Sequence, residues 1–407
     1  MTLHLDQIRA DFPILKETVD GKPLTYLDNA ATTQKPQAVI DAITDYYTHY
    51  NSNIHRGAHH LSNLATEAHE KARQRVQAYL NAAHDHEIIF TRGTTESINL
   101  VAFSFGEGFV NPGDEVIVTA LEHHSNFVPW QMMCERRGAR FRVVPFDENG
   151  ELRLDIFANL LNEKTRIVAF NHVSNSLGTI NPARKMIQMA HDAGAAVLVD
   201  AAQSVQHIEH DVQALDADFY AFSGHKIYGP TGIGVLYGKE KWLNAMPPYQ
   251  GGGEMIDLVT EEKTTYNKLP FKFEAGTPNV VGPIGLAVAL DYLDSLGFAE
   301  VRAHEDEVLE YGREKLQEIP GLTLYGNSEY RTSILAFNIA GIHHYDLGTL
   351  LDTQGVAVRT GHHCTQPIMT TLGIDGTVRA SLALYNTKAD IDALETAIYK
   401  VRKMLGK

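Results

Sequence analysis

The stretch Asp218-Phe219-Tyr220-Ala221-Phe222-Ser223-Gly224-His225-Lys226 carries the pattern that decides the fold. Its apolar part is typical of a buried strand, and Ser, His and Lys follow where that strand should end. A second apolar run, residues 196–199, ends at Asp200 and is followed by Gln203. Because ligands of open α/β sheets collect beyond the carboxyl ends of the strands, we expect these polar groups to meet at one edge.

Together these residues offer the groups that pyridoxal 5'-phosphate (PLP) requires. Lys226 supplies an amine for a Schiff base, and Asp200 supplies a carboxylate for the pyridine nitrogen. Ser223 and His225 are suited to holding the phosphate. A lysine at a strand end is usually only a solvated charge, so the combination, and not Lys226 alone, predicts a PLP site.

Apolar runs rich in branched residues alternate with amphipathic segments along the first two thirds of the chain. This pattern is typical of a mostly parallel sheet with helices on both faces. The predicted strands are residues 87–90, 115–119, 141–144, 167–170, 196–199, 218–222 and 234–237, and a helix is expected over residues 182–193. We therefore predict an α/β fold whose large domain has a mostly parallel seven-stranded sheet.

The pattern changes after Gly251-Gly252-Gly253 and the segment 273–279. Helices are expected over residues 280–296 and 301–318, strands over 334–338 and 356–359, and a closing helix from Thr387. The predicted organisation is an N-terminal segment (1–20) that packs with the small domain, a large PLP-binding domain (21–284) and a smaller C-terminal α/β domain (285–407).

Composition excludes several classes of protein. The 407 residues carry a net charge of −15 without a basic run, which argues against a nucleic-acid partner. Apolar stretches such as residues 283–289 are too short to cross a membrane, and the N-terminus lacks the basic and apolar blocks of a signal peptide. Two cysteines exclude a disulfide scaffold and suit a reducing compartment. We expect a cytoplasmic protein.

The two cysteines differ in their surroundings. Cys134 lies in a predicted helix, residues 130–135, where a buried cysteine is commonly a small hydrophobic residue. Cys364 follows His362-His363, which raises the alternative of a metal site. Three consecutive ligands suit tetrahedral zinc poorly and no Cys-x-x-Cys accompanies them, so we expect no metal.

Further polar residues follow other predicted strands. Thr94 and Thr95 open a helix after residues 87–90 and can bind a phosphate there, although they can equally be a simple helix cap. His123 can cover a cofactor ring and move a proton, whereas a lone histidine is more often a core or surface residue. Asn175 is a candidate contact for the cofactor or a substrate carboxylate, with a turn as the alternative.

Three motifs in combination carry a resemblance to a known family. Asp200-x-x-Gln203, Ser223-Gly224-His225-Lys226 and Arg359-x-Gly361-His362-His363-Cys364 resemble those of the class II (SufS-type) cysteine desulfurases. These are fold type I PLP-dependent transferases of the class V aminotransferase family. The resemblance runs from Tyr26 to Leu382. The cysteine motif is specific to the desulfurases, whereas the PLP motifs indicate only the superfamily.

The resemblance implies a role for each matching residue. Lys226 is similar to the lysine that binds PLP covalently, Asp200 to the partner of the pyridine nitrogen, Gln203 to the donor to the phenolic oxygen and His123 to the stacking imidazole. Thr94, Thr95, Ser223 and His225 resemble the phosphate site. The substrate would contact Arg379, which is similar to the carboxylate anchor, and Asn175 and Arg359. In a homodimer the neighbouring subunit would add Thr277, His55 and Arg56.

The implied reaction converts L-cysteine to L-alanine and leaves a persulfide on Cys364, supplying sulfur for iron–sulfur cluster assembly. A short cysteine loop implies an acceptor protein of the SufE or SufU type. Thr365, where relatives often have Ala, and Gln250, where some have an acid, depart from the family. A selenocysteine lyase or another PLP enzyme of the same family is the alternative, and a PLP-binding regulator is a third interpretation.

Overall fold

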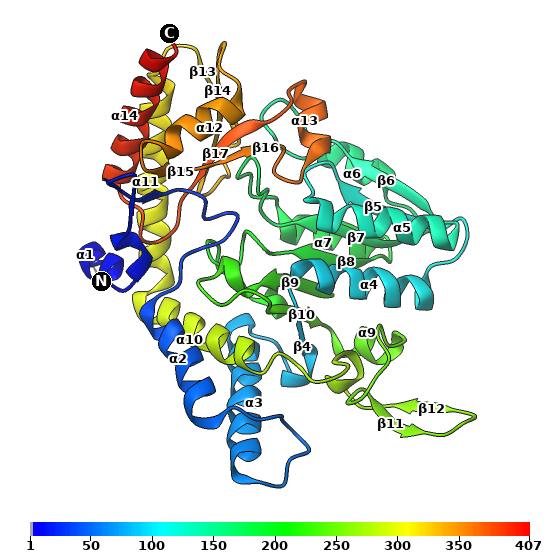
Figure 1. Ribbon diagram of the computed structural model, residues 1–407. Coiled ribbons are helices and arrows are strands. Elements are labelled where there is room, and N and C mark those ends of the chain that lie inside the picture. Colours follow the sequence, from blue (N-terminus) through cyan, green and yellow to red (C-terminus); the bar gives the residue numbers. More distant parts are fainter. Residues whose placement is uncertain (1–2) are drawn as a thin grey trace.

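The computed structural model describes residues 3–407 and is built around a seven-stranded sheet (Figure 1). The strand order is β4, β10, β9, β8, β7, β5, β6, and only β10 runs antiparallel to its neighbours. The strands are β4 (Ile88–Thr91), β5 (Glu115–Thr119), β6 (Arg140–Val144), β7 (Thr165–Asn171), β8 (Ala196–Asp200), β9 (Phe219–Ser223) and β10 (Gly234–Gly238). The predicted mostly parallel sheet is therefore confirmed.

Both faces of this sheet are apolar because its inner strands are apolar at consecutive positions. In β8, Val197 and Val199 join one core, whereas Ala196 and Leu198 join the other. The first core also receives residues of α3 (His60–Leu80), α7 (Ala183–Asp192) and α10 (Val281–Leu296). The second receives residues of α4 (Thr94–Phe109), α5 (Val128–Arg137) and α9 (Glu240–Ala245). Helices thus cover both sides.

The C-terminal part contains an antiparallel four-stranded sheet in the order β13, β14, β17, β16. Its strands are β13 (Leu322–Tyr325), β14 (Ile334–Ile339), β16 (Arg359–Gly361) and β17 (Thr377–Ser381). Its helices are α11 (Phe298–Gln317), α12 (His344–Asp352), α13 (Gln366–Leu372) and α14 (Lys388–Met404). A separate core joins α11, α12 and α14 to this sheet.

The remaining elements lie in the N-terminal segment, in the connections between strands of the large sheet and in one projecting hairpin. The N-terminal ones are α1 (Leu5–Ala10), β1 (Thr18–Val19), β2 (Lys22–Pro23), β3 (Thr25–Tyr26) and α2 (Gln37–Asp45); α6 (Leu154–Leu160) and α8 (Val212–Leu215) are short helices. The hairpin β11 (Ile256–Val259) and β12 (Thr264–Tyr266) extends away from the body in Figure 1.

The strand expected over residues 356–359 differs in detail from the observed one. Residues Val356–Ala357 form β15, which pairs in parallel with β3, whereas β16 begins at Arg359 and pairs with β17. The chain changes partners between these two strands. Arg359 therefore begins a strand, whereas the sequence placed it at a strand end.

We propose a modified division of the chain. Residue 285 lies inside α10, which packs against α2 and α3, so a boundary near Gly297, between α10 and α11, keeps that helix with the large sheet. In the N-terminal segment, Arg9 donates to the Tyr385 carbonyl (2.7 Å) and to Asp390 of α14 (3.0 Å). These contacts support its assignment to the small domain.

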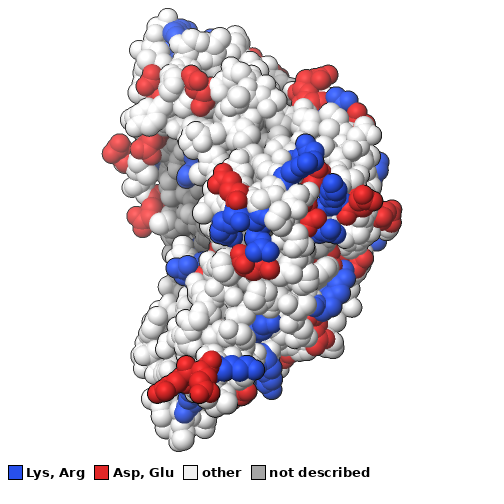
Figure 2. Space-filling model, turned by 90° about the vertical axis from the view of Figure 1, so that its right-hand side faces the viewer, with Lys and Arg blue, Asp and Glu red and all other residues white. Residues whose placement is uncertain are grey.

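The distribution of charge and the apolar character of the helices both bear on what the protein can bind. Acidic and basic side chains are interspersed on the face shown in Figure 2, which offers no continuous basic surface. Among the helices of residues 3–407, none combines the length and the apolar character that a membrane crossing requires.

Candidate active site

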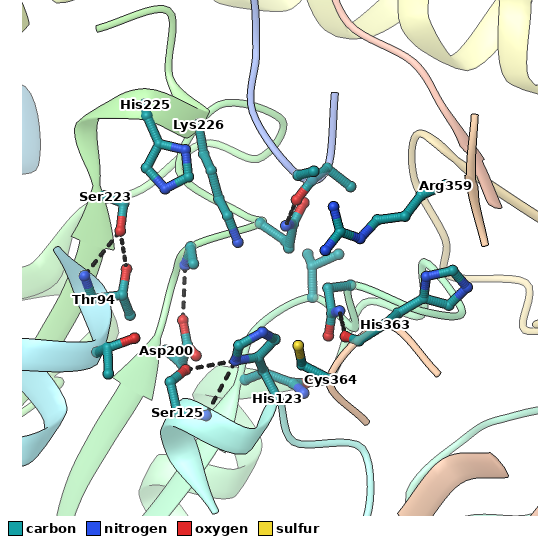
Figure 3. Close-up of a pocket in the computed structure, with 18 of the residues that line it drawn as sticks. Thr94, His123, Ser125, Asp200, Ser223, His225, Lys226, Arg359, His363 and Cys364 are labelled. Atoms are coloured by element: carbon teal, nitrogen blue, oxygen red, sulfur yellow. Dashed lines mark hydrogen bonds between the residues drawn. The ribbon is translucent and has the colours of Figure 1, made fainter. Parts of the chain in front are cut away.

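A cavity of about 240 Å³ lies at the carboxyl ends of the central strands (Figure 3). It is lined by Thr94, Thr95, His123, Asn175, Asp200, Gln203, Ser223, His225, Lys226, Arg359, Cys364 and Arg379, all of which the sequence singled out. The side chains of Lys226, Arg359 and Cys364 point into it from different sides. Residues separated by up to 285 positions are therefore brought together at one edge of the sheet.

One end of the cavity is formed by the start of α4 and the end of β9. The backbone N–H of Thr94 donates to Ser223 Oγ (2.8 Å), and the two hydroxyl oxygens also lie 2.8 Å apart. At Gly234 a Cβ atom would lie 2.3 Å from the Cα of Gly93, so only glycine permits this approach of β10. The N–H groups and hydroxyls at this helix start form a site suited to a phosphate.

Lys226 follows β9 in a short 3-10 turn, Gly224–Lys226. The carbonyl of His225 accepts hydrogen bonds from Thr33 N (3.0 Å), Thr32 Oγ1 (3.0 Å) and Lys35 Nζ (3.1 Å), which fix the peptide bond that precedes Lys226. Burial lowers the pKa of Lys226 to about 8, although Asp200 acts in the opposite direction. At pH 7 a lysine with this pKa is a free amine in roughly a tenth of the molecules, far more than an exposed lysine, and the free amine is the form that makes a Schiff base.

Asp200 and Gln203 lie at the end of β8. Asp200 accepts a hydrogen bond from the N–H of Ala202 (2.9 Å), and burial raises its pKa above the ordinary value while Ala202 and Lys226 oppose this rise. Gln203 donates to the Ala30 carbonyl (2.7 Å), and within the described chain its Oε1 is buried without a hydrogen-bond partner. Both side chains therefore have polar atoms that a polar ring can satisfy.

His123 is held in a defined orientation. Its Nδ1 accepts a hydrogen bond from the N–H of Ser125 (3.1 Å) and lies 2.8 Å from Ser125 Oγ. Since Nδ1 accepts, a neutral ring carries its proton on Nε2. Burial lowers the pKa of His123 to about 3, and the charge of Lys226 adds to this effect. The ring is therefore neutral at physiological pH.

Glu122 is a buried acid that the sequence did not single out. Thr119 Oγ1 (2.5 Å), Asn126 Nδ2 (2.6 Å) and the N–H of Asn171 (3.0 Å) all donate to its carboxylate. Burial nevertheless raises its pKa to about 8. Asn171 is the last residue of β7 and lines the cavity. Its hydrogen bond to Glu122 therefore connects the end of β7 to the segment that carries His123.

Arg379 and Arg359 line another part of the cavity, and Asp28 lies beside both of them. Arg379 donates to the Asn175 carbonyl (2.8 Å) and pairs with Asp28 (3.3 Å), while Arg359 lies 3.8 Å from Asp28. Burial lowers the pKa of Arg379 to about 10. In residues 3–407 its Nε atom has no hydrogen-bond partner, which leaves a donor for a carboxylate. Asp28 follows no predicted strand end, so sequence reasoning could not place it here.

Cys364 lies in the loop between β16 and α13, and its sulfur points into the cavity (Figure 3). Its carbonyl accepts from the N–H of His124 (2.8 Å), and its own N–H donates to His362 Nδ1 (3.1 Å). Cys134 is instead buried in α5, and burial raises the pKa of its thiol to about 11. Because the thiolate is the nucleophile, burial makes Cys134 a poor one, and of the two cysteines only Cys364 lines the cavity.

Three predicted site residues do not line this cavity. Thr277 lines a separate surface pocket with Arg92, Glu96 and Gln250. His55 contacts Glu70 (2.9 Å) and Glu254 (3.1 Å), and Arg56 pairs with Glu254 (3.1 Å). Their predicted contribution to the site of a neighbouring subunit stays a prediction.

The residues present fit PLP. The start of α4 offers donors for a phosphate, Asp200 offers a carboxylate and Lys226 offers an amine. Gln203 donates one amide hydrogen to the Ala30 carbonyl, and its NH2 group has a second hydrogen for the phenolic oxygen. Across residues 3–407, no group of three or more His, Cys, Asp or Glu side chains is arranged to hold a metal ion.

Comparisons with known proteins agree with this geometry. Residues 25–394 match the family model described as aminotransferase class-V. A cysteine desulfurase of Escherichia coli O7:K1 is 51% identical over all 407 residues of both chains. A cysteine desulfurase of Synechococcus elongatus is 52% identical over 98% of this chain, which spans 64% of that relative's length.

Solved structures extend the likeness to the whole fold. The cysteine desulfurase CsdA of Escherichia coli superposes with a TM-score of 0.92 at 42% identity, covering 99% of this chain and 100% of the other. The apo cysteine desulfurase of Thermococcus onnurineus NA1 gives a TM-score of 0.94 at 37% identity, covering 99% of each chain. The chain belongs to the cysteine desulfurases of the aminotransferase class-V family.

Proposed function

We propose that this protein is a PLP-dependent cysteine desulfurase that converts L-cysteine to L-alanine and takes up the sulfur atom as a persulfide on Cys364. The observation that carries the proposal is the placement of one reactive thiol, one amine of lowered pKa and one buried arginine in a single cavity. Sγ of Cys364 forms a bond to the substrate sulfur, and the bond between that sulfur and the substrate Cβ breaks. The electron pair of the broken bond stays with Cβ, which takes up one proton in place of the proton that the Cys364 thiol loses, so atoms and electrons balance.

Each cavity residue has a role in this reaction. Arg379 binds the substrate carboxylate, with Asn175 and Arg359 beside it, because a planar guanidinium suits a carboxylate. Lys226 holds PLP and removes the α-proton, and His123 covers the ring and is the second candidate base. PLP supplies an electron sink for the substrate α-carbon when bound. Thr94, Thr95, Ser223 and His225 hold its phosphate.

We further propose the SufS type, with a protein of the SufE or SufU type as sulfur acceptor. The loop that carries Cys364 contains only residues 362–365, between β16 and α13, and it is bonded to the large sheet on several sides. A persulfide on such a loop cannot travel far, so an acceptor must approach it. Iron–sulfur cluster assembly is the proposed use of the sulfur.

A homodimer is the proposed assembly. Thr277, His55 and Arg56 lie outside the cavity of their own chain, which fits a contribution to a second copy. The hairpin β11–β12 exposes Leu258 and Val259, each 58% accessible, which suits burial against another subunit.

The unpaired state of Cys134 and Cys364 supports a cytoplasmic location.

The assay that tests the function measures L-alanine formation from L-cysteine by the PLP-loaded protein. We expect slow turnover alone and acceleration by a SufE-type or SufU-type acceptor at constant reductant. Cys364→Ser should abolish sulfur transfer, whereas Cys134→Ser should retain it. L-Selenocysteine tests the alternative: a rate that is faster and independent of Cys364 would favour a selenocysteine lyase, and no alanine from either substrate would contradict the proposal.

A further inference from the structure

The loop of Cys364 has an anchor that lies outside the cavity. Thr365 and Ser176 are both fully buried, and their hydroxyl oxygens lie 2.7 Å apart. Thr365 Oγ1 also donates to the carbonyl of His362 (2.8 Å). The pair therefore joins the cysteine loop to the segment that follows β7 of the large sheet.

The backbone of this loop needs such support. His363 has φ 52° and Cys364 has φ 58°, so two consecutive residues with side chains adopt the left-handed conformation. This region is sparsely populated for residues other than glycine, and it persists only where surrounding contacts impose it. The orientation of the Cys364 thiol therefore depends on what holds the loop.

Most other anchors of the loop belong to the cavity itself. Asn175 Nδ2 donates to the His363 carbonyl (2.9 Å), and the His124 N–H donates to the Cys364 carbonyl. Asn175, His363 and Cys364 line the cavity, whereas Ser176 and Thr365 do not. An effect of the Ser176–Thr365 pair on the reaction must pass through the conformation of the loop.

We propose that Thr365 and Ser176 are positioning residues that hold the Cys364 thiol in line for sulfur uptake. This inference rests on the proposed desulfurase function. Since removal of the substrate α-proton is assigned to Lys226 and needs no thiol, the pair affects sulfur uptake and leaves proton removal intact. Thr365, a departure from the family pattern, thereby acquires a physical role.

The variants are chosen to remove one hydroxyl at a time. Thr365→Val keeps the shape and removes the hydroxyl, Ser176→Ala removes its partner, and the double variant removes both. Thr365→Ser restores the hydroxyl. Thr371→Val is the matched control, because the Thr371 hydroxyl is exposed and donates only to its own helix, at the Pro367 carbonyl.

Three measurements on the PLP-loaded protein separate positioning from general damage. We expect Thr365→Val to slow persulfide formation on Cys364, followed by mass spectrometry, by about five- to tenfold, the effect of one buried hydrogen bond. Exchange of the L-alanine α-hydrogen in deuterated water should be unchanged. The rate at which iodoacetamide alkylates Cys364 in the absence of substrate should differ between Thr365→Val and the wild-type protein, because the loop that holds the thiol relaxes in the variant. Thr365→Ser should restore all rates.

The double variant should be no slower than Thr365→Val, since both remove the same contact. Wild-type persulfide and alkylation rates in Thr365→Val would overturn the inference, as would an equal loss of α-hydrogen exchange or a failure of Thr365→Ser to restore the rates. If the wild-type protein forms no alanine from L-cysteine, the proposed function fails separately, and the alkylation rates still decide whether the pair orders the loop.

Discussion

Lys226 shows how a single residue acquires reactivity from its surroundings. Burial lowers its pKa most, Asp200 raises it, and Arg379 and Arg359 lower it further. The result, about 8, lies well below that of an exposed lysine. Because only the free amine attacks an aldehyde, the pH dependence of PLP loading reports this environment.

We predict that the rate of PLP binding to the apoprotein rises from pH 6.5 with a midpoint near pH 8 and levels off by roughly pH 9. The rate increases with pH because Lys226 loses its proton over that range and only the free amine reacts. The cofactor absorbance band gives the rate, and borohydride trapping with mass spectrometry locates the label. A rate that continues to rise towards pH 10, or a label on another lysine such as Lys35, would contradict the assignment.

Glu122 gives a second prediction at this scale. Glu122→Gln places an amide NH2 group where two N–H donors, of Asn126 and Asn171, face it and only the Thr119 hydroxyl can turn to accept. We expect a loss of about 1–3 kcal/mol in the free energy of unfolding, measured by urea denaturation. Glu67→Gln, at an exposed ion pair with Lys71, is the control and should change it little.

The sequence identified site residues where they directly follow apolar strands. Asp200, Ser223 and Lys226 belong to this class, since strand ends meet at one edge of the sheet. Asp28 and Glu122 could not be found in this way, because their roles depend on contacts with Arg379 and Asn171 that only tertiary packing creates. The position of Cys364 came from the family resemblance.

At the scale of elements, the strands of the large sheet were predicted to within about two residues because nearly all of them contain a short, continuously apolar run. The hairpin β11–β12 was not predicted, since its exposed residues show no such run. β15 and β16 were merged into one strand because a change of pairing partner leaves no signature in the sequence.

The hairpin is predicted to form part of the subunit interface. Leu258→Glu combined with Val259→Glu would bury charges against an apolar surface, so we expect the dimer to weaken and the monomer fraction to rise. Light scattering over a concentration series measures this. Met404→Glu, at a residue 60% exposed on α14, is the control. Unchanged association of the hairpin variant would exclude this element from the interface.

The whole molecule contains several imidazoles that burial keeps neutral. The pKa is lowered to about 4 for His69, His172 and His225, to about 3 for His123 and to about 2 for His363. In the unfolded chain these groups take up protons near pH 6.5. The unfolded state therefore binds more protons than the folded state between about pH 4 and 6.5.

We predict that the free energy of unfolding falls as the pH falls from about 6.5 to 5. Groups whose pKa is raised act in the opposite sense, namely Glu122, Asp28, Asp200, Asp306 and His55, but the imidazoles of lowered pKa outnumber them. His172→Phe should reduce the slope by at most about 1.4 kcal/mol per pH unit, because one titrating ring is removed. Urea denaturation at several pH values tests this, and a flat profile would contradict it.

The central claim is that Lys226 and Cys364 act on one substrate within one cavity. The most direct test incubates the PLP-loaded protein with isotopically labelled L-[³⁴S]cysteine, without reductant, and maps the label by peptide mass spectrometry while L-alanine is quantified. We predict one labelled sulfur on Cys364, formed with an equal amount of alanine, and neither product in Lys226→Ala. Alanine formed without label on Cys364, or label on Cys134 instead, would contradict this account.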